Sequence, residues 1–164
     1  SAEASLEMLM RAALGQHKEY FQLLSYRVVD QKVGEADVPV PEATIRVRVG
    51  MHEVHTAALG NGPVNALFKA LLKALIRFYP RLAEMRLEDY KVRVLPGSGS
   101  TDAKVRVLIE SRDAHDRWGT VGVSFDIIEA SWAALVDGIN YKLFKDEQQK
   151  KDFHTQLEKA LPKA

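Results

Sequence analysis

The spacing of hydrophobic positions changes several times along the 164-residue chain, and each spacing predicts a type of element. Residues 2–14 have apolar side chains at helical intervals and are followed by Gly15, which predicts a short amphipathic helix. The next segments, "LLSYRVVD", "TIRVRVG" and "EVHTAAL", are rich in β-branched residues and alternate apolar with polar positions, so they predict three strands. The apolar positions of the first helix are Leu6, Leu9, Met10, Ala13 and Leu14.

A long apolar stripe follows the third predicted strand and predicts a helix that Pro80 ends. Its apolar positions are Val64, Leu67, Phe68, Leu71, Leu72, Leu75, Ile76 and Tyr79, and its polar face carries Lys69, Lys73 and Arg77. We assign Phe68, and Trp132 further along the chain, to core packing.

The same order of elements recurs in the second half of the chain. Strands are predicted at residues 87–95, 104–110 and 117–123, a hairpin connection at 96–100 and a helix at 124–139. A shift of 60 residues superposes "IRVRV" (45–49) on "VRVLI" (105–109), and it places Gly62 on Gly122, Ala70 on Ala130 and Leu75 on Leu135. The pattern indicates a βββα unit that is used twice.

The predicted fold class is α+β, with two pseudo-symmetric βββα units, helices packed on antiparallel sheets and an extra N-terminal helix. Such a pair creates a cleft between the two matching helix starts. We divide the chain into a linker helix (1–15), one domain (16–143, with units at about 20–80 and 87–141) and a charged tail (144–164) that is either a frayed helix or unstructured.

Composition excludes several function classes. The 46% of hydrophobic residues suffice for a core, and a net charge of +1 gives no overall field that attracts nucleic acid or membranes. The absence of cysteine removes disulfides, thiol catalysis and cysteine metal sites. No apolar run approaches the roughly 20 residues that span a bilayer, and no signal segment is recognisable. We expect a soluble, cytoplasmic protein.

Three short motifs resemble catalytic or binding signatures but lack an essential part. In "MHEVH", His52 and His55 are three residues apart on a predicted strand, whereas a zinc protease needs histidines four apart on a helix. "GVSFD" lacks the second glycine of a nucleophile elbow, so we predict Ser124 as the N-cap of the second helix. "GNGPVN" fits neither the dinucleotide fingerprint nor a Walker motif. No nucleophile, base and orienting group converge, so no catalytic residues are predicted.

Arginines alternate with valines in "IRVRV" and "KVRVL", which predicts a basic sheet face. Such a face is a solvated surface, a subunit contact or, as a remote alternative, a nucleic-acid-binding sheet. The aromatic residues that stack on bases are missing from these strands.

The start of the first long helix, at Gly60-Asn61-Gly62-Pro63, is the strongest candidate for a binding site. Unpaired N–H groups and the positive end of the helix dipole suit a carboxylate or phosphate, and glycines let a ligand approach the backbone. An ordinary tight strand-to-helix turn explains the same residues equally well. Val64, Leu87, Val94 and Val123 would supply an apolar lining, and Asp89 could bind a cation, a combination that describes a small amino acid.

The segments "HTAALGNGPVNAL", "LEDYKVRVL" and "WGTVGVSFDIIEASWAAL" resemble the C-terminal regulatory domain of the isopropylmalate synthase and citramalate synthase family, in particular its citramalate synthase branch. The resemblance covers roughly residues 20–143, and the leading helix is similar to the family's linker helices. It implies a homodimer that binds isoleucine, or alternatively leucine, as a feedback inhibitor. It also implies a separate catalytic barrel in the full-length chain, to which the divalent metal and acetyl-CoA belong; no cofactor is expected here.

The resemblance also implies a set of effector-binding residues. From the glycine-rich turn, the first strand of the second unit and the second helix start, these are Gly60, Asn61, Gly62, Pro63, Val64, Asn65, Leu87, Asp89, Tyr90, Val94, Val123, Ser124 and Asp126. Tyr90 has an ordinary alternative role as a core aromatic of a strand.

Overall fold

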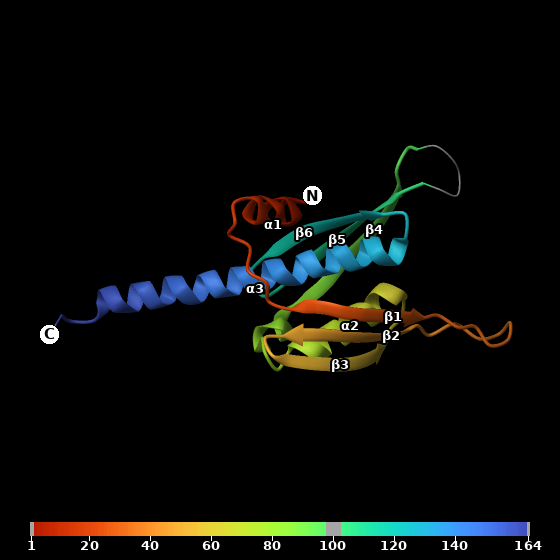
Figure 1. Cartoon of the computed structure of the whole chain (residues 1–164), viewed down its shortest axis with the longest axis horizontal. Coiled ribbons are helices and arrows are strands. Elements are labelled where there is room, and N and C mark those ends of the chain that lie inside the picture. Colours follow the sequence, from red (N-terminus) through yellow and green to blue (C-terminus); the bar gives the residue numbers. More distant parts are fainter. Residues whose placement is uncertain (1, 98–102, 164) are drawn as a thin grey trace.

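The structure, a computed structural model, describes residues 2–97 and 103–163 and contains a leading helix followed by two βββα units (Figure 1). In chain order the elements are α1 (Glu3–Ala13), β1 (Gln22–Val29), β2 (Glu42–Val49), β3 (His52–Leu59), α2 (Pro63–Leu75), the 3₁₀ helix η1 (Pro80–Glu84), β4 (Arg86–Val94), β5 (Val105–Arg112), β6 (Arg117–Ser124) and α3 (Ile127–Ala160). The predicted α+β fold with its repeated unit is confirmed. Pro80 opens η1 instead of ending the preceding helix, because α2 already ends at Leu75.

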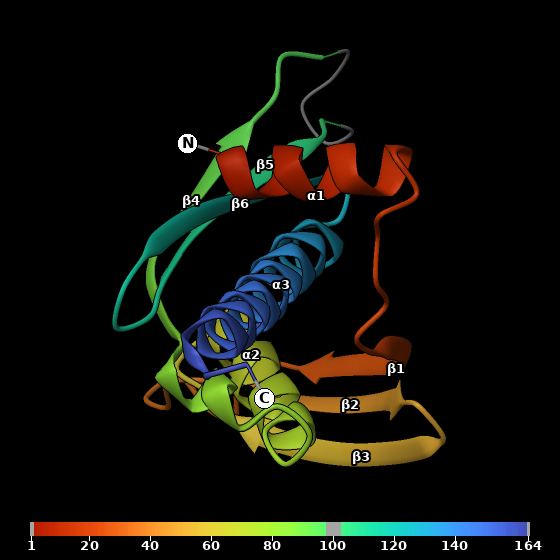
Figure 2. The ribbon, with the colours of Figure 1, turned by 90° about the vertical axis from the view of Figure 1, so that its left-hand side faces the viewer.

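Each unit forms an antiparallel three-stranded sheet, in the orders β1–β2–β3 and β4–β5–β6. The alternation in β2 buries Ile45 and Val47 and leaves Arg46 and Arg48 on the exposed face. Helix α2 packs on β2 and β3, and α3 packs on β5 and β6, so both helices lie between the two sheets (Figure 2). Each fully buried leucine or isoleucine in this layer contributes about 1.5–3 kcal/mol.

The two units correspond with a shift of 64 residues, as the strand pairing shows. Tyr26 pairs with Ile45 and Ile45 with Thr56 in the first sheet; Tyr90, Ile109 and Thr120 occupy the same places in the second. The irregularity in β1 between Leu23 and Ser25 likewise recurs in β4 between Leu87 and Asp89. The shift of 60 predicted from glycine and alanine identities was wrong.

Two threonines confirm the corrected correspondence. Thr56 Oγ1 donates to the carbonyl oxygen of Ala70 at 2.9 Å, and Thr120 Oγ1 donates to that of Ala134 at 2.7 Å. In each unit the third strand is thereby bonded to the helix that packs on it. The correspondence matches the N-cap of α2, Gly62, with the N-cap of α3, which is Asp126.

Helix α1 packs along β6 and α3 through a different face from the predicted one. Ala4 and Met8 are buried, whereas the predicted apolar positions Leu6, Leu9, Met10, Ala13 and Leu14 are exposed. Polar bonds fix the contact: Ser5 Oγ donates to Asp137 Oδ2 at 2.9 Å and accepts from the backbone N–H of Val121 at 2.9 Å. Small residues therefore let α1 approach closely, and its larger apolar side chains face outward.

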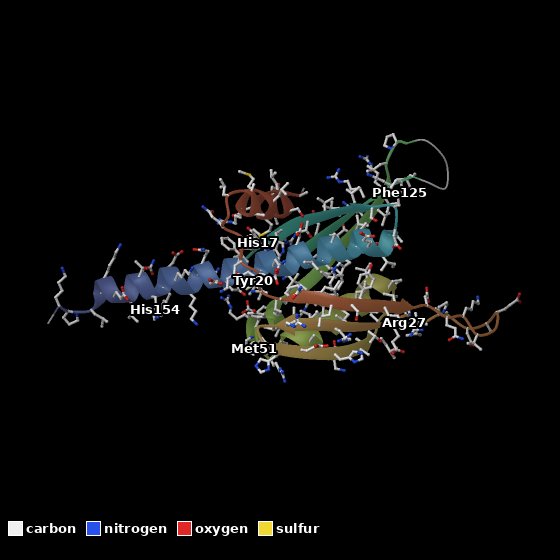
Figure 3. All side chains as sticks on the ribbon, viewed as in Figure 1. His17, Tyr20, Arg27, Met51, Phe125 and His154 are labelled. Carbon is white, nitrogen blue, oxygen red and sulfur yellow. The ribbon has the colours of Figure 1, made fainter. Side chains whose placement is uncertain are left out.

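Helix α3 is much longer than the predicted segment 124–139. It continues without interruption through residues 144–160, the region expected to be a frayed helix or tail. This part extends away from the sheets, and His154 lies on it (Figures 1 and 3). Every side chain from Gln149 to Lys163 is exposed.

A cluster of buried charges joins α3 to η1 and to the turn between β5 and β6. The fully buried Lys142 Nζ bonds to Asp113 at 2.8 Å, Asp146 at 3.0 Å and Glu84 at 3.1 Å. Burial alone lowers the pKa of Lys142, but these carboxylates outweigh it and hold that pKa above its usual value. Lys145 also bonds to Asp113, so that carboxylate has two cationic partners.

No helix in the described parts of the chain is long and apolar enough to cross a membrane. Part of the predicted hairpin at 96–100 lies outside the described residues, although β4 and β5 on either side of it pair antiparallel.

Candidate functional site

A cavity of about 430 Å³ lies where the two helix starts meet β4 and β5. This volume is within the range of about 300–1,000 Å³ typical of small-molecule sites. Its lining is mostly apolar. The residues are Gly62, Pro63, Val64 and Asn65 from α2, Leu87, Glu88, Asp89 and Tyr90 from β4, Ile109 from β5, and Ile127 and Ile128 from α3.

The first turn of α2 supplies unpaired backbone donors to this cavity. Gly62 is the N-cap and has no side chain with which to cap the helix; Pro63 has no N–H to pair. The first intrahelical bond is donated by the Ala66 N–H to Gly62 O at 3.0 Å. The N–H groups of Val64 and Asn65 therefore lie at the positive end of the helix dipole, and no side chain caps them.

The preceding turn is held by the protein itself, which changes the role of two predicted residues. A side chain at Gly60 would place its Cβ 2.3 Å from the backbone nitrogen of Ala66, so glycine is needed there for backbone packing. The N–H of Asn61 donates to Asn65 Oδ1 at 3.1 Å. Neither Gly60 nor Asn61 is among the cavity-lining residues, although both shape the turn beside it.

The start of α3 differs from that of α2 because its donors are already occupied. Asp126 Oδ1 accepts from the N–H of Ile128 at 2.7 Å and from that of Glu129 at 3.2 Å. Asp126 is therefore the N-cap, and the prediction that Ser124 has this role was wrong; Ser124 ends β6 and its Oγ accepts from the Asp126 N–H at 3.1 Å. Only one of the two helix starts at the cavity can accept an anion.

Tyr90 links the β4 wall to α3. Its hydroxyl lies 3.0 Å from Ser131 Oγ, and Ser131 in turn donates to the carbonyl oxygen of Ile127 at 2.7 Å. Because the serine hydrogen is used in that bond, Tyr90 is the donor to Ser131. Tyr90 remains 40% exposed, so its ring lines the cavity instead of being buried in the core.

Two neighbouring carboxylates on β4 have different partners. Glu88 is paired with Arg112 at 3.0 Å and with Arg117 at 3.5 Å. Asp89 accepts from the Tyr90 N–H at 2.9 Å, and its other oxygen lies 3.3 Å from Nζ of the largely exposed Lys91. Asp89 is half exposed and is the carboxylate better able to bind an additional cation.

The structure brings together seven of the predicted residues: Gly62, Pro63, Val64, Asn65, Leu87, Asp89 and Tyr90. Val94 and Val123 are exposed and lie outside the lining, as do Ser124 and Asp126. Sequence reasoning missed Glu88, Ile109, Ile127 and Ile128. Ile109 could have been found from its alternation with Val107 in β5, whereas the two isoleucines at the start of α3 have no distinctive signal.

A larger groove, of about 660 Å³, lies between η1 and the second half of α3. Its charged rim is already paired within the protein, because Lys18 bonds to Glu147 at 3.1 Å and Arg81 to Glu84 at 2.9 Å. The smaller cavity, with open donors and an apolar lining, is the better ligand site. Over residues 2–97 and 103–163, no three His, Asp or Glu side chains are grouped to hold a metal ion.

Sequence comparison identifies relatives of this chain. It is 57% identical over 147 residues to (R)-citramalate synthase of Geobacter sulfurreducens, which covers 90% of the chain, and 55% identical over 149 residues to the enzyme of Aquifex aeolicus, which covers 91%. It is 33% identical over 121 residues, 74% of the chain, to 2-isopropylmalate synthase of Aquifex aeolicus. The chain spans 28% of the length of those citramalate synthases and 22% of that isopropylmalate synthase.

The model of the LeuA allosteric (dimerisation) domain matches residues 1–143, which include α1 and both units up to the middle of α3. The helical extension after Leu143 lies beyond the match. The matched region contains both βββα units and the cavity between their helix starts. The chain therefore belongs to the LeuA allosteric (dimerisation) domain family.

Proposed function

We propose that this chain is the regulatory domain of a citramalate synthase and that its cavity binds isoleucine as a feedback inhibitor. The observation that carries the proposal is the composition of one cavity, which combines the uncapped first turn of α2, the Asp89 carboxylate and several aliphatic side chains. These groups complement the carboxylate, the ammonium and the branched side chain of an amino acid.

Each part of the ligand has a named counterpart. The carboxylate would accept from the N–H groups of Val64 and Asn65, and the ammonium would lie near Asp89. The aliphatic side chain would contact the apolar lining, which is Leu87, Ile109, Ile127 and Ile128.

Leucine is the alternative effector, and the higher identity to citramalate synthases than to isopropylmalate synthases favours isoleucine. The two ligands differ in one methyl position, which is worth only about 1–3 kcal/mol.

The catalytic part of the proposed enzyme would lie in the remaining length of the full protein, as a barrel that uses a divalent metal to condense acetyl-CoA with a 2-oxo acid. The regulatory domains would form a homodimer. An effector can change activity only if it binds two arrangements of this assembly with unequal affinity. The cavity lies between elements of both units, so closure of the units around the ligand is a suitable origin for that difference.

Calorimetric titration with isoleucine, leucine, valine and alanine tests the proposal. We expect saturable binding of isoleucine, weaker binding of leucine and valine, and no measurable binding of alanine. Asp89→Asn should weaken isoleucine binding by about tenfold to a hundredfold, since a hydrogen bond to a charged group is worth about 1.5–3 kcal/mol. Asp152→Asn, the same change on the exposed part of α3, is the matched control. An absence of heat with all four amino acids would remove the proposed function.

A further inference from the structure

Every element that surrounds the cavity has a counterpart beside the first sheet, formed by β1, β2 and the same two helix starts with their positions exchanged. With the 64-residue correspondence, Leu23, Tyr26 and Ile45 take the places of Leu87, Tyr90 and Ile109. Similarly, the start of α3 takes the place of the start of α2, so Asp126 replaces Gly62, Glu129 replaces Asn65 and Trp132 replaces Phe68. These three wall residues are similar in the two units, but Ser25 takes the place of Asp89, and the helix start has an acidic N-cap in place of a glycine.

Asp126 occupies the donors that an effector carboxylate would use at this counterpart position. Its Oδ1 accepts from the N–H groups of Ile128 and Glu129, which correspond to those of Val64 and Asn65. The side chain of Glu129 adds a second negative charge in the first turn of the helix. A ligand carboxylate would therefore meet occupied donors and two like charges.

Trp132 covers the tyrosine of the first unit. Its ring is stacked on Tyr26 with centroids 5.2 Å apart and an interplanar angle of 26°, and Trp132 is only 9% exposed. Burial raises the pKa of Tyr26, and the charges of Asp126 and Glu129 raise it further, which agrees with their position around this ring. Tyr90, by contrast, lines the open cavity.

We propose that a closed counterpart of the effector site lies between the sheet of the first unit and the start of α3, in which the Asp126 carboxylate takes the place of the effector carboxylate and Trp132 covers Tyr26, so that each chain accepts one effector molecule. This inference rests on the proposed function of the open cavity. It explains why two similar units provide one site: the open site depends on the missing cap at Gly62, and the closed one on the cap at Asp126.

The direct test places the same cap on α2. Gly62 has an extended backbone, with φ at −156°, and a Cβ built there meets nothing within 4 Å, so Gly62→Asp is sterically permitted. We expect the new carboxylate to cap α2 as Asp126 caps α3, which keeps the melting temperature at or slightly above that of the wild type. The isoleucine affinity should fall by more than about a hundredfold, because like charges compete for the same donors.

Gly62→Ala is the size control, since it adds a methyl group without a cap, and it should weaken binding less than Gly62→Asp. Titration of the wild-type chain should give one isoleucine per chain. Two molecules per chain, or a Gly62→Asp variant that binds as tightly as Gly62→Ala, would overturn the inference and leave the proposed function intact. A wild-type chain that binds no amino acid would instead refute the proposed function, and the inference with it.

Discussion

Gly122 lies in β6 where the strand crosses the start of α3, and the approach is closer than any side chain permits. A Cβ at this position would lie 2.0 Å from the carbonyl oxygen of Ala130. Both partners are backbone, so neither can move aside cheaply. The glycine therefore serves packing within the second unit; it does not correspond to Gly62, with which sequence identity had aligned it.

Gly122→Ala should accordingly destabilise the domain by about 1–3 kcal/mol or more, the usual cost of overpacking a core. Gly97→Ala is the matched control, because its added Cβ would meet only Leu95 O, at 3.9 Å. Urea unfolding of the two variants measures the difference. Equal stability of both would show that β6 and α3 lie further apart than described.

The buried carboxylate of Asp113 makes the stability of the folded domain depend on pH in the acidic range. Burial by itself raises its pKa, but bonds from Lys142, Lys145 and the N–H groups of His115 and Asp116 outweigh that effect and hold the pKa well below its usual value. Because the folded pKa is lower than the unfolded pKa of about 3.9, the stabilisation is present above that pH and is lost as pH falls towards the folded pKa.

Asp113→Asn should therefore lower the free energy of unfolding at pH 7 by about 3 kcal/mol, as expected when one partner of a buried ion pair is removed. It should also reduce the loss of stability between pH 4 and pH 2 that the wild type shows. Urea unfolding at several pH values, with Asp152→Asn as the control, measures both effects. An unchanged acid dependence in Asp113→Asn would rule out this carboxylate as its source.

At the scale of elements, α3 has an inner part, up to residue 150, that contacts the rest of the domain, and an outer part, from Lys151 onward, that is exposed to solvent. Asp146 and Glu147 still contact the rest of the domain, through ion pairs with Arg81 and Lys18. From Lys151 onward every side chain is exposed, and a helix of about ten unpacked residues is marginally stable in water. The outer part should add helix content but little to the stability of the domain.

Removal of residues 151–164 should then leave the melting temperature unchanged, while removal of residues 144–164 should lower it because Asp146 and Glu147 are lost with it. Circular dichroism measures both the helix content and the melting temperature of these truncated chains. A lower melting temperature in the shorter deletion would mean that the outer part of α3 packs against something, such as a second copy of the chain.

Patterns in the sequence were sufficient to predict the number, type and order of most elements. β2 and α2 each bury one face, and the apolar residues of that face recur at strand or helix spacing in the sequence. The spacing alone therefore predicts the type of each element. For the outer part of α3 the sequence left a frayed helix and an unstructured tail as alternatives, because its charged residues form no such stripe. The buried face of α1 was misassigned because Ala4 and Met8, the two residues buried there, gave a weaker signal than the exposed leucines.

The candidate site was predicted in part, for a related reason. The start of α2 was recognisable from its glycines and proline, but the cap at Asp126 depends on where α3 begins, and helix boundaries are the least reliable part of a sequence-based prediction. Ile109 and Ile127 reach the cavity only through the packing of both units. Neither the volume of the cavity nor its closed counterpart beside the first sheet has a local sequence signal.

At the scale of the whole molecule, membership of a dimerisation domain family leads us to expect association of this chain without the rest of the protein. Sedimentation should give twice the chain mass of 18.4 kDa at micromolar concentration. The exposed apolar side chains at Val92 and Val94 of β4 and at Leu6 and Leu9 of α1 are candidates for the contact. A monomer at all accessible concentrations would show that association needs the rest of the protein.

The most direct test of the central claim is a crystal structure of this chain with isoleucine. We predict one ligand per chain in the cavity between the start of α2 and β4, with its carboxylate on the N–H groups of Val64 and Asn65, its ammonium beside Asp89 and its side chain against Ile109. A ligand found instead beside Tyr26, in the groove between η1 and α3, or with its carboxylate away from the start of α2 would contradict the account.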